Sequence, residues 1–526
     1  MICNSIIINL IFAIFNTLKN AFNSSPIFKV MGKFEEWLSN VLNGSTAWNL
    51  FRRRDSLTEV WENSLIYRSI NWMFNIVPTS LSSIYSKKEQ ILQESRFIQY
   101  LRFTVERFDV VIALCLVIIL VVPHNYWDNM YSTLIVLLLF ALYAFKIIIN
   151  KNDIFNFKAL DIALVIFIIT VVMAQVTSLF PKESLRFFIF FATSFLLLIN
   201  IVSSIRSERS LNTFIEIILV GITITGLYAI YQTIKGVPFD PSLTDLTLNE
   251  GMAGRAYSSM GNPNNYAELL ILTLPFYAAV IFNSKSMLKR LVFIVLLLPP
   301  LLGLFTTGSR SSWIALVISI IVLVFFKEWR LIPLVIILGV LAFPLLPYIS
   351  PTVYKRVLTI FNSNDTSIGY RGLIYQTIEP MFKDFWLTGV GLGAGVESAP
   401  FMKILQRYSL YYLQKSVPGG YVTTPPHTHN LFLQIWIEVG FMGILTFIWF
   451  IFRLFKKCML SIFNKVNDSI RHIFMAGLAA LSGILVMGVP EHVWFYPRIM
   501  LFFWVIVGIM LAALNVSATK QEVLEG

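Results

Sequence analysis

The chain has 526 residues, of which 56% are hydrophobic and 13% charged, and its mean hydropathy is +0.72. A soluble domain carries about a quarter charged residues, so this composition excludes a soluble globular protein and indicates one that crosses a membrane repeatedly. The formal net charge is +12, but the basic residues lie in short loops between apolar runs, which argues against a nucleic-acid partner.

The first 105 residues mix apolar, acidic and basic residues at helical spacing. Stretches such as "FNSSPIFKVMGKFEEWLSNVLNG" and "KKEQILQESRFIQYLRFTVERF" are too polar to span a bilayer. The apolar run near residues 6–15 is followed by no clear small-residue cleavage site, which disfavours a signal peptide. Residues 1–105 are therefore predicted to form amphipathic helices on the cytoplasmic surface of the membrane.

The remainder of the chain is dominated by long apolar runs. A spanning helix needs about 20 apolar residues, so residues 106–516 are predicted to form an all-α, polytopic domain of twelve transmembrane helices. The runs are 107–123, 131–149, 160–180, 185–204, 212–234, 265–282, 289–306, 310–326, 331–349, 430–452, 470–489 and 497–515.

Basic loops alternate with loops that are poor in Lys and Arg. Every second loop carries basic residues, for example Lys327 and Arg330, whereas "PHNYWDNM" between the first two runs has none. By the positive-inside rule the basic loops face the cytoplasm, and twelve spans place both termini there. The same charges predict membrane lipids, especially anionic ones, as partners.

One segment predicted to face outward, residues 350–429, is far longer than the other loops. Loops of this length are usually functional or disordered. Helix-like stretches such as "YRGLIYQTIEPMF" predict a large external loop that is folded and partly helical. The run "GVGLGAG" at 389–395 lacks the strand and helix of a dinucleotide-binding loop, so it is interpreted as a flexible turn.

Four arginines lie at the outward ends of the predicted spans or in the outward loops: Arg255, Arg310, Arg371 and Arg498. An arginine at the edge of the hydrocarbon marks either a functional site or an interfacial anchor. Arg310 fits the anchor least well, because the small residues of "TTGSRSSW" leave room for a ligand and a helix N-terminus favours anions. Several converging guanidinium groups would suit a diphosphate, whose oxygens they bind bidentately.

The stretch "PPHTHNLFLQIWIEVG" closes the long outward segment and opens a predicted span. The two prolines end any preceding helix, and Thr428 or Asn430 can cap the next one, which places His427 and His429 at the outer boundary. Such a histidine can act as a general base or simply bond at the interface. Glu438 is an intramembrane carboxylate and therefore a functional candidate. It follows His429 by nine positions, which on a continuous helix puts the two residues on opposite faces, so a structural bond to a neighbouring helix is an equal alternative.

Other titratable residues carry weaker signals. Cys3, Cys115 and Cys458 have neither the spacing of a zinc site nor that of a disulfide framework, so no metal is predicted. Glu491 and His492 in "PEHVWFYPR" are a secondary site candidate, with an interfacial aromatic belt as the alternative.

Four stretches, taken in order, resemble the O-antigen ligase and O-antigen polymerase superfamily. They are "GRAYSSMGNPNNYAELL", "TTGSRSSWIALV", "YRGLIYQTIEPMFKDFWLTGVGLGAG" and "THNLFLQIWIEVGFMGIL". The resemblance covers roughly 210–450 well and, through the span layout, 106–515. It implies a GT-C-like bacterial membrane glycosyltransferase that is inverting, needs no metal or cofactor, and uses a glycan on undecaprenyl diphosphate as donor.

The resemblance also implies roles by position. Arg255, Arg310 and Arg371 would bind the diphosphate, and His429 would activate the acceptor hydroxyl. The residues kept as secondary candidates are His427, Asn430, Glu438, Asn264 and Arg498.

The favoured function is a glycan ligase that acts on the outer side of the bacterial cytoplasmic membrane, as in lipopolysaccharide assembly. Its acceptor would be a hydroxyl of a glycan, a lipid or a protein. The alternative is a polysaccharide polymerase that joins lipid-linked repeat units through the same donor chemistry. A transporter or flippase for lipid-linked sugars is more distant, because the halves of the chain show no similarity and the candidate residues lie at one face.

Overall fold

The computed structural model describes residues 24–52, 56–150, 152–157, 160–237, 254–349, 351–358, 366–416, 425–464 and 466–525, together with Thr17 and Asn20. Within these ranges the secondary structure is entirely helical, without a strand. The all-α class predicted from composition is thereby confirmed.

The helices of the first part of the chain are mostly short until α9. In order they are α2 (Pro26–Gly44), α3 (Thr46–Arg52), α4 (Ser56–Asn63), α5 (Leu65–Lys87), α6 (Glu89–Gln93), α7 (Arg96–Glu106), α8 (Phe108–Val121), η2 (His124–Tyr126), α9 (Asn129–Ile149), α10 (Ile162–Val176), α11 (Pro181–Ser204) and α12 (Glu208–Lys235).

The second part begins with a short 3-10 turn before α13. The helices are η4 (Ser258–Met260), α13 (Pro263–Asn283), α14 (Met287–Thr306), α15 (Arg310–Glu328), η5 (Trp329–Leu331), α16 (Ile332–Ala342), η6 (Phe343–Leu345), α17 (Leu346–Ile349), α18 (Pro351–Leu358), α19 (Thr366–Phe385), α20 (Pro400–Ser416), α21 (Leu431–Val439), α22 (Phe441–Phe463), α23 (Asp468–Met487) and α24 (Pro497–Glu525).

The protein is a multi-pass membrane protein by the length and apolarity of its helices. Eight helical runs among the described residues are long and apolar enough to cross a bilayer. Seven are single helices, namely α9, α11, α12, α13, α14, α23 and α24, and the eighth is the continuous run Arg310–Tyr348. Two further apolar helices, α8 and α10, are shorter.

Three of the predicted spans differ in the structure. The run 430–452 is not one helix, because Gly440 has a φ of +85° and divides it into α21 and α22. A residue with a side chain would be strained there. The runs 310–326 and 331–349 are joined through η5 without an intervening loop.

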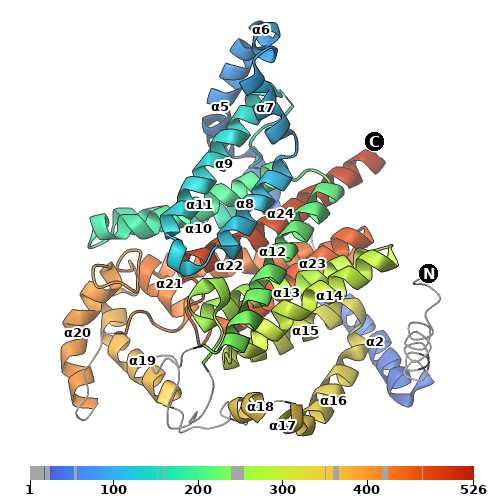
Figure 1. Ribbon diagram of the computed structural model, residues 1–526, viewed down its shortest axis with the longest axis vertical. Helices are drawn as coiled ribbons and strands as arrows, with labels where there is room; N and C mark the ends of the chain where they lie inside the picture. Colours follow the sequence, from blue (N-terminus) through green and yellow to red (C-terminus); the bar gives the residue numbers. More distant parts are fainter. Residues whose placement is uncertain are drawn as a thin grey trace.

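The most buried spans are those of α24, α13 and α23, and α15 packs against α13 and α23. Nearly four-fifths of the spanning windows of α13 and α23 are buried, against 22% for α14. Figure 1 shows these helices running together through the middle of the molecule, with α18, α19 and α20 along the lower edge of the view. The helices α18, α19 and α20 of the long loop thus gather at one end of these helices.

The N-terminal helices contact several parts of the bundle. On α2, Glu35 accepts a hydrogen bond from Nε of Arg330 at 3.0 Å. On α5, Asn75 forms two hydrogen bonds with the backbone of Phe155, one through each side-chain atom, at 2.8 and 3.2 Å. Bulky apolar side chains such as Trp72 remain exposed on these helices. Their predicted place on the cytoplasmic membrane surface stays a prediction.

The glycine run 389–395, here called the glycine strap, is a fixed part of the fold. Val390 N donates to Ile437 O at 2.8 Å, and Gly395 N donates to Pro426 O at 2.8 Å, so the strap is bonded to both ends of the stretch 426–437. Gly389 has a φ of +71°, and a Cβ on it would lie 2.6 Å from Glu438 O. The prediction of a flexible turn is therefore wrong, because left-handed glycines here allow close packing rather than motion.

Candidate active site

Two arginines clasp the turn between α14 and α15. Nε of Arg255 donates to Thr307 O at 2.6 Å, and Nε of Arg356 donates to Gly308 O at 3.1 Å. Gly308 has a φ of +59°, and a Cβ on it would lie 3.6 Å from Arg255. The small residues around Arg310 thus let two guanidinium groups approach the backbone.

Arg310 begins α15 directly after this turn. Its side chain is half-buried, whereas Ser309 and Ser312 on either side are buried. Arg255 also donates through Nη2 to Asn264 Oδ1 at 2.6 Å, and Asn264 lies in the first turn of α13. Two helix N-termini and three arginines therefore meet in one place, which is an arrangement that attracts anions.

The electrostatics of Arg255 show how close these groups lie. Burial is the largest cause that lowers the pKa of Arg255, to about 9, and the positive charges of Arg356 and Arg310 lower it further. The carboxylate of Glu491 opposes them and raises the pKa. The guanidinium still carries its charge at neutral pH, so an anion bound here would relieve repulsion among like charges.

Glu491 connects the cationic region to the histidine turn. One carboxylate oxygen accepts from Nη2 of Arg371 at 2.7 Å, and the other lies 3.4 Å from Nδ1 of His429. The carboxylate is 9% exposed. Arg371, which comes from α19 in the long loop, keeps a buried Nε without a hydrogen-bond partner among the described residues. This N–H is available to an additional acceptor.

His429 is held in an unusual backbone conformation. Its φ is +49°, a value that residues with a Cβ rarely adopt and that often marks a functional turn. The following residue, Asn430, caps α21 by accepting from Leu433 N at 2.9 Å, so of the two caps that the sequence allowed, Thr428 and Asn430, it is the second that serves. Leu431 N in turn donates to Glu491 O at 3.1 Å. The histidine turn is thus bonded to the segment that carries its carboxylate partner.

His427 supports this turn rather than facing Glu491. Its Nδ1 accepts the backbone N–H of His429 at 3.1 Å, and the two rings lie 4.1 Å apart. Burial, followed by the charges of His429, His492 and Arg371, holds the pKa of His427 well below its usual range. A neutral ring whose Nδ1 is already occupied is a poor base, so the geometry favours His429.

Glu438 lies in its own helix with a partner one turn away. Its Oε1 accepts from Nε2 of Gln434 at 2.7 Å, and Gln434 Oε1 accepts from Thr428 N at 2.9 Å. The sequence left open whether Glu438 bonds to a neighbouring helix. In the structure its partner is Gln434 in the same helix. Gln434 and Thr428 are fully buried.

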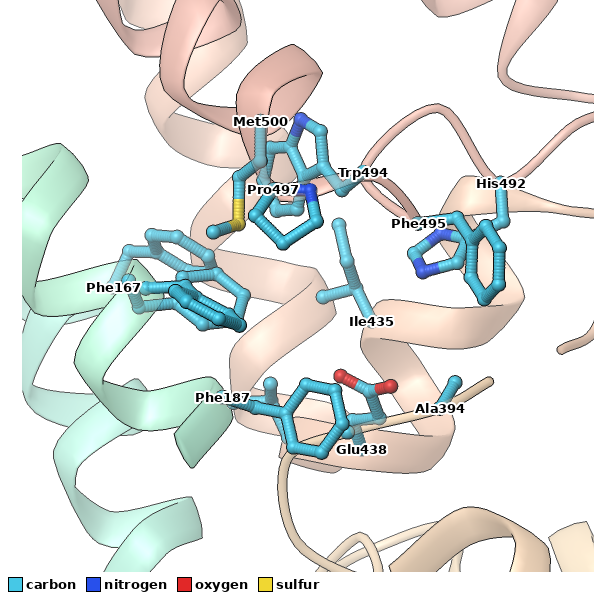
Figure 2. Close-up of a pocket in the computed structure, with 14 residues that line it drawn as sticks. Phe167, Phe187, Ala394, Ile435, Glu438, His492, Trp494, Phe495, Pro497 and Met500 are labelled. Carbon is cyan, nitrogen blue, oxygen red and sulfur yellow. The ribbon is translucent and has the colours of Figure 1, made fainter. Parts of the chain in front are cut away.

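A pocket lined by both Glu438 and His492 lies beside α21. Figure 2 shows the Glu438 carboxyl group directed into it, with Phe167 and Phe187 on one side and His492 on the other. Burial, and then His429, lower the pKa of His492 to about 3. Its Nδ1 has no hydrogen-bond partner within the described part of the chain.

Arg498 is not joined to the arginine cluster by its described contacts. Its Nη1 donates to Ile119 O at 3.0 Å and to Val122 O at 2.8 Å, and the guanidinium lies over Trp127. These carbonyls belong to the C-terminal end of α8, where a cation is favoured by the helix dipole. Arg498 therefore joins α24 to α8.

Two residues of this region escaped the sequence reasoning. Arg356 lies in a short polar helix of the long loop, and its only sequence signal was a basic residue in a segment predicted to face outward. Glu268 is a buried carboxyl on α13, and it interacts electrostatically with the carboxylate of Glu491. An ionisable residue inside an apolar run is a signal that could have revealed it.

A protein-family model matches a segment that contributes residues to this site. The family model described as O-Antigen ligase matches residues 292–448. The predicted family resemblance is confirmed. The matched segment includes Arg310, Arg371 and His429, whereas Arg255 and Glu491 lie outside it.

Two curated relatives match a larger part of the chain. The ComP-specific O-oligosaccharyltransferase of Acinetobacter baylyi is 24% identical over 351 residues, which is 64% of this chain and 58% of the relative. The teichuronic acid biosynthesis protein TuaE of Bacillus subtilis is 21% identical over 281 residues, 50% of this chain and 53% of the relative. The chain thus spans little more than half the length of these curated relatives.

Proposed function

We propose that the protein is a membrane glycosyltransferase that moves a glycan from a polyprenyl diphosphate, such as undecaprenyl diphosphate, to an acceptor hydroxyl. The observation that carries the proposal is the bridge from Arg371 through Glu491 to His429, at 2.7 and 3.4 Å. A candidate base, His429, and a candidate phosphate ligand, Arg371, thus contact the same carboxylate, beside the cluster of Arg255, Arg310 and Arg356.

His429 is the proposed general base. Its Nδ1–H donates to Glu491, which leaves the lone pair of Nε2 for the proton of the acceptor hydroxyl. The acceptor oxygen attacks the anomeric carbon while the bond from that carbon to the diphosphate oxygen breaks. A single displacement of this kind inverts the configuration of the anomeric carbon.

The arginines are proposed to stabilise the leaving diphosphate. As the glycosidic bond breaks, negative charge grows on the diphosphate oxygens, and guanidinium groups held in place are aimed at that charge. Arg255, Arg310, Arg356 and Arg371 would share this role. They would supply the positive charge that a divalent metal supplies in other transferases, so the reaction is proposed to be independent of metal and of any cofactor.

The membrane arrangement is proposed to comprise twelve spans with both termini in the cytoplasm. The continuous run Arg310–Tyr348 counts as two spans when it is divided at η5, and α8, α10 and the pair α21–α22 complete the set. The basic loops then face inward, and the site faces the outer side of the bacterial cytoplasmic membrane. Residues 1–105 would lie on the cytoplasmic surface.

The acceptor class is proposed to be that of a ligase. The relative named as an O-oligosaccharyltransferase supports transfer of an assembled glycan to a separate acceptor, be it glycan, lipid or protein. The relative named for teichuronic acid biosynthesis favours the alternative, a polymerase that joins lipid-linked repeat units. A polymerase would convert the lipid-linked donor alone into a ladder of longer chains, whereas a ligase would leave it unchanged until an acceptor is added.

The deciding experiment is transfer by the purified full-length protein with a polyprenyl diphosphate glycan in the presence of EDTA. We expect turnover to continue, with inverted configuration in the product. Turnover that requires an added divalent metal would contradict the arginine mechanism. If the donor is not consumed with a hydroxyl acceptor of any class, the proposed function itself is contradicted.

A further inference from the structure

We propose that Glu438 is a positioning residue that holds the His429 turn and the arginine-bearing long loop in register. The proposal rests on the proposed function, because it concerns the same base. Glu438 does not touch the reacting atoms in this account. It acts through two sets of contacts, one toward the histidine turn and one toward the glycine strap.

The first set runs along α21 to the histidine turn. Glu438 accepts from Gln434 at 2.7 Å, and Gln434 accepts from the backbone N–H of Thr428 at 2.9 Å. Thr428 directly precedes His429, whose left-handed backbone needs support from its surroundings. The side chain of Gln434 therefore fixes the peptide between His427 and Thr428, one residue before the base.

The second set joins Glu438 to the glycine strap. Gly391 N donates to Glu438 O at 3.1 Å, and the carboxyl group takes a hydrogen bond from the backbone of Gly393. The strap follows α19, the helix that carries Arg371. Arg371 and His429 meet again at Glu491, so the contacts form a closed ring around the site.

The chemistry of the position supports a role beyond packing. The Glu438 carboxyl is directed into a pocket lined mainly by aromatic and aliphatic side chains (Figure 2). A polar group in such surroundings is costly, and an apolar side chain would fill the space more stably. What the carboxyl provides, and an apolar residue cannot, is an acceptor for both Gln434 and the strap.

The bonding pattern can be tested by an exchange of residues. Gln434 both accepts from Thr428 and donates to Glu438, so Gln434→Leu breaks the chain of bonds. The double change Gln434→Glu with Glu438→Gln restores it. The new glutamate accepts from Thr428 and from the new glutamine amide, and the amide oxygen still accepts from the strap.

The experiment measures transfer and hydrogen–deuterium exchange on full-length protein in nanodiscs. For Gln434→Leu we expect kcat to fall about 100-fold, because a displaced base loses alignment, with the KM for the lipid-linked donor nearly unchanged. The amides of Thr428 and His429 should exchange about tenfold faster. The double exchange should return both quantities to within about fivefold of the parent. Thr446→Val is the matched control, since Thr446 is buried in α22 and bonds only its own helix.

The outcomes separate the inference from the function it rests on. Normal transfer by Gln434→Leu, with or without faster amide exchange, would overturn the positioning role. Failure of the double exchange to restore protection of the Thr428 amide in a folded protein would overturn it as well. A parent that transfers no glycan would sink the proposed function alone, because the amide exchange would still report whether Gln434 and Glu438 hold the turn.

Discussion

The same three helices carry a histidine-centred network at each of their two ends. Asn264, Arg310 and Glu491 lie at or just beyond one end of α13, α15 and α23, next to His429. At the other end, His472 lies between Lys327 and Asn283, at 2.9 and 2.5 Å from its two ring nitrogens. The two networks differ in burial and in partners, because the His429 side chain is 25% exposed whereas His472 is buried.

The difference between the networks is one of completeness. Both ring nitrogens of His472 are bonded, so that network is closed and joins helices. His429 has a carboxylate on Nδ1, whereas the described residues give its Nε2 no hydrogen bond. Several arginines also lie near His429, whereas the one carboxylate that they contact or attract is Glu491 among the described contacts. In a structural network the polar groups bond to one another. In a functional site, a base and several positive charges stay available to a substrate.

The strongest test of this comparison replaces each histidine. We expect His429→Ala to lower transfer by about 1000-fold, since general base catalysis contributes 10²–10⁴-fold, while donor binding is kept. His472→Ala should leave transfer within about threefold of the parent, because its network only packs helices. The measurement is the initial rate of transfer and the affinity for the lipid-linked donor. Equal losses of transfer rate in the two variants would contradict the distinction between the two networks.

The second test changes the cation at each end of α15. Arg310→Lys keeps the charge but loses the bidentate fork, so transfer should fall about 100-fold. The control is Lys327→Arg at the other end of the same helix, which should stay near the parent rate. Rates are measured at saturating donor and again at low donor. Parent-like turnover by Arg310→Lys would mean that Arg310 is an interfacial anchor.

The third test removes the charge of Glu491 without changing its shape. Glu491→Gln no longer stabilises the imidazolium that forms on His429, so we expect kcat to fall about tenfold or more. The loss should exceed that of Glu379→Gln, which removes an exposed carboxylate on α19 that pairs with Lys383. An unaltered kcat would show that Glu491 serves Arg371 alone.

The smallest expected effect is acid sensitivity of the His429 end. The pKa values of His427 and His492 are lower in the folded protein than in an unfolded chain, so unfolding takes up protons as the pH falls below about 6.5. Stability should therefore be lost on going from pH 7 to pH 5, by up to about 2 kcal/mol per histidine. The thermal midpoint of His492→Gln should fall less over this range. A midpoint that falls equally in both proteins would assign the acid sensitivity to other groups.

Local patterns in the sequence predicted much of the site. Arg255, Arg310, Arg371 and His429 were singled out by unusual residue types next to apolar runs, and the structure brings them to one region around Glu491. Arg498 was grouped with them because it too lies at the outward end of a predicted span. Its actual partners are carbonyls at the end of α8, which no local pattern indicates.

The sequence by itself determined the helical class and most of the apolar runs, and it narrowed the cap of α21 to Thr428 or Asn430, because hydropathy and capping depend on neighbours along the chain. It also showed the resemblance to the O-antigen ligases. Only the tertiary structure decided that His429 rather than His427 faces Glu491, that Arg356 joins the cluster, and that Glu438 bonds to Gln434. These facts depend on side chains from distant segments, on the break at Gly440 and on a left-handed turn, which hydropathy cannot encode.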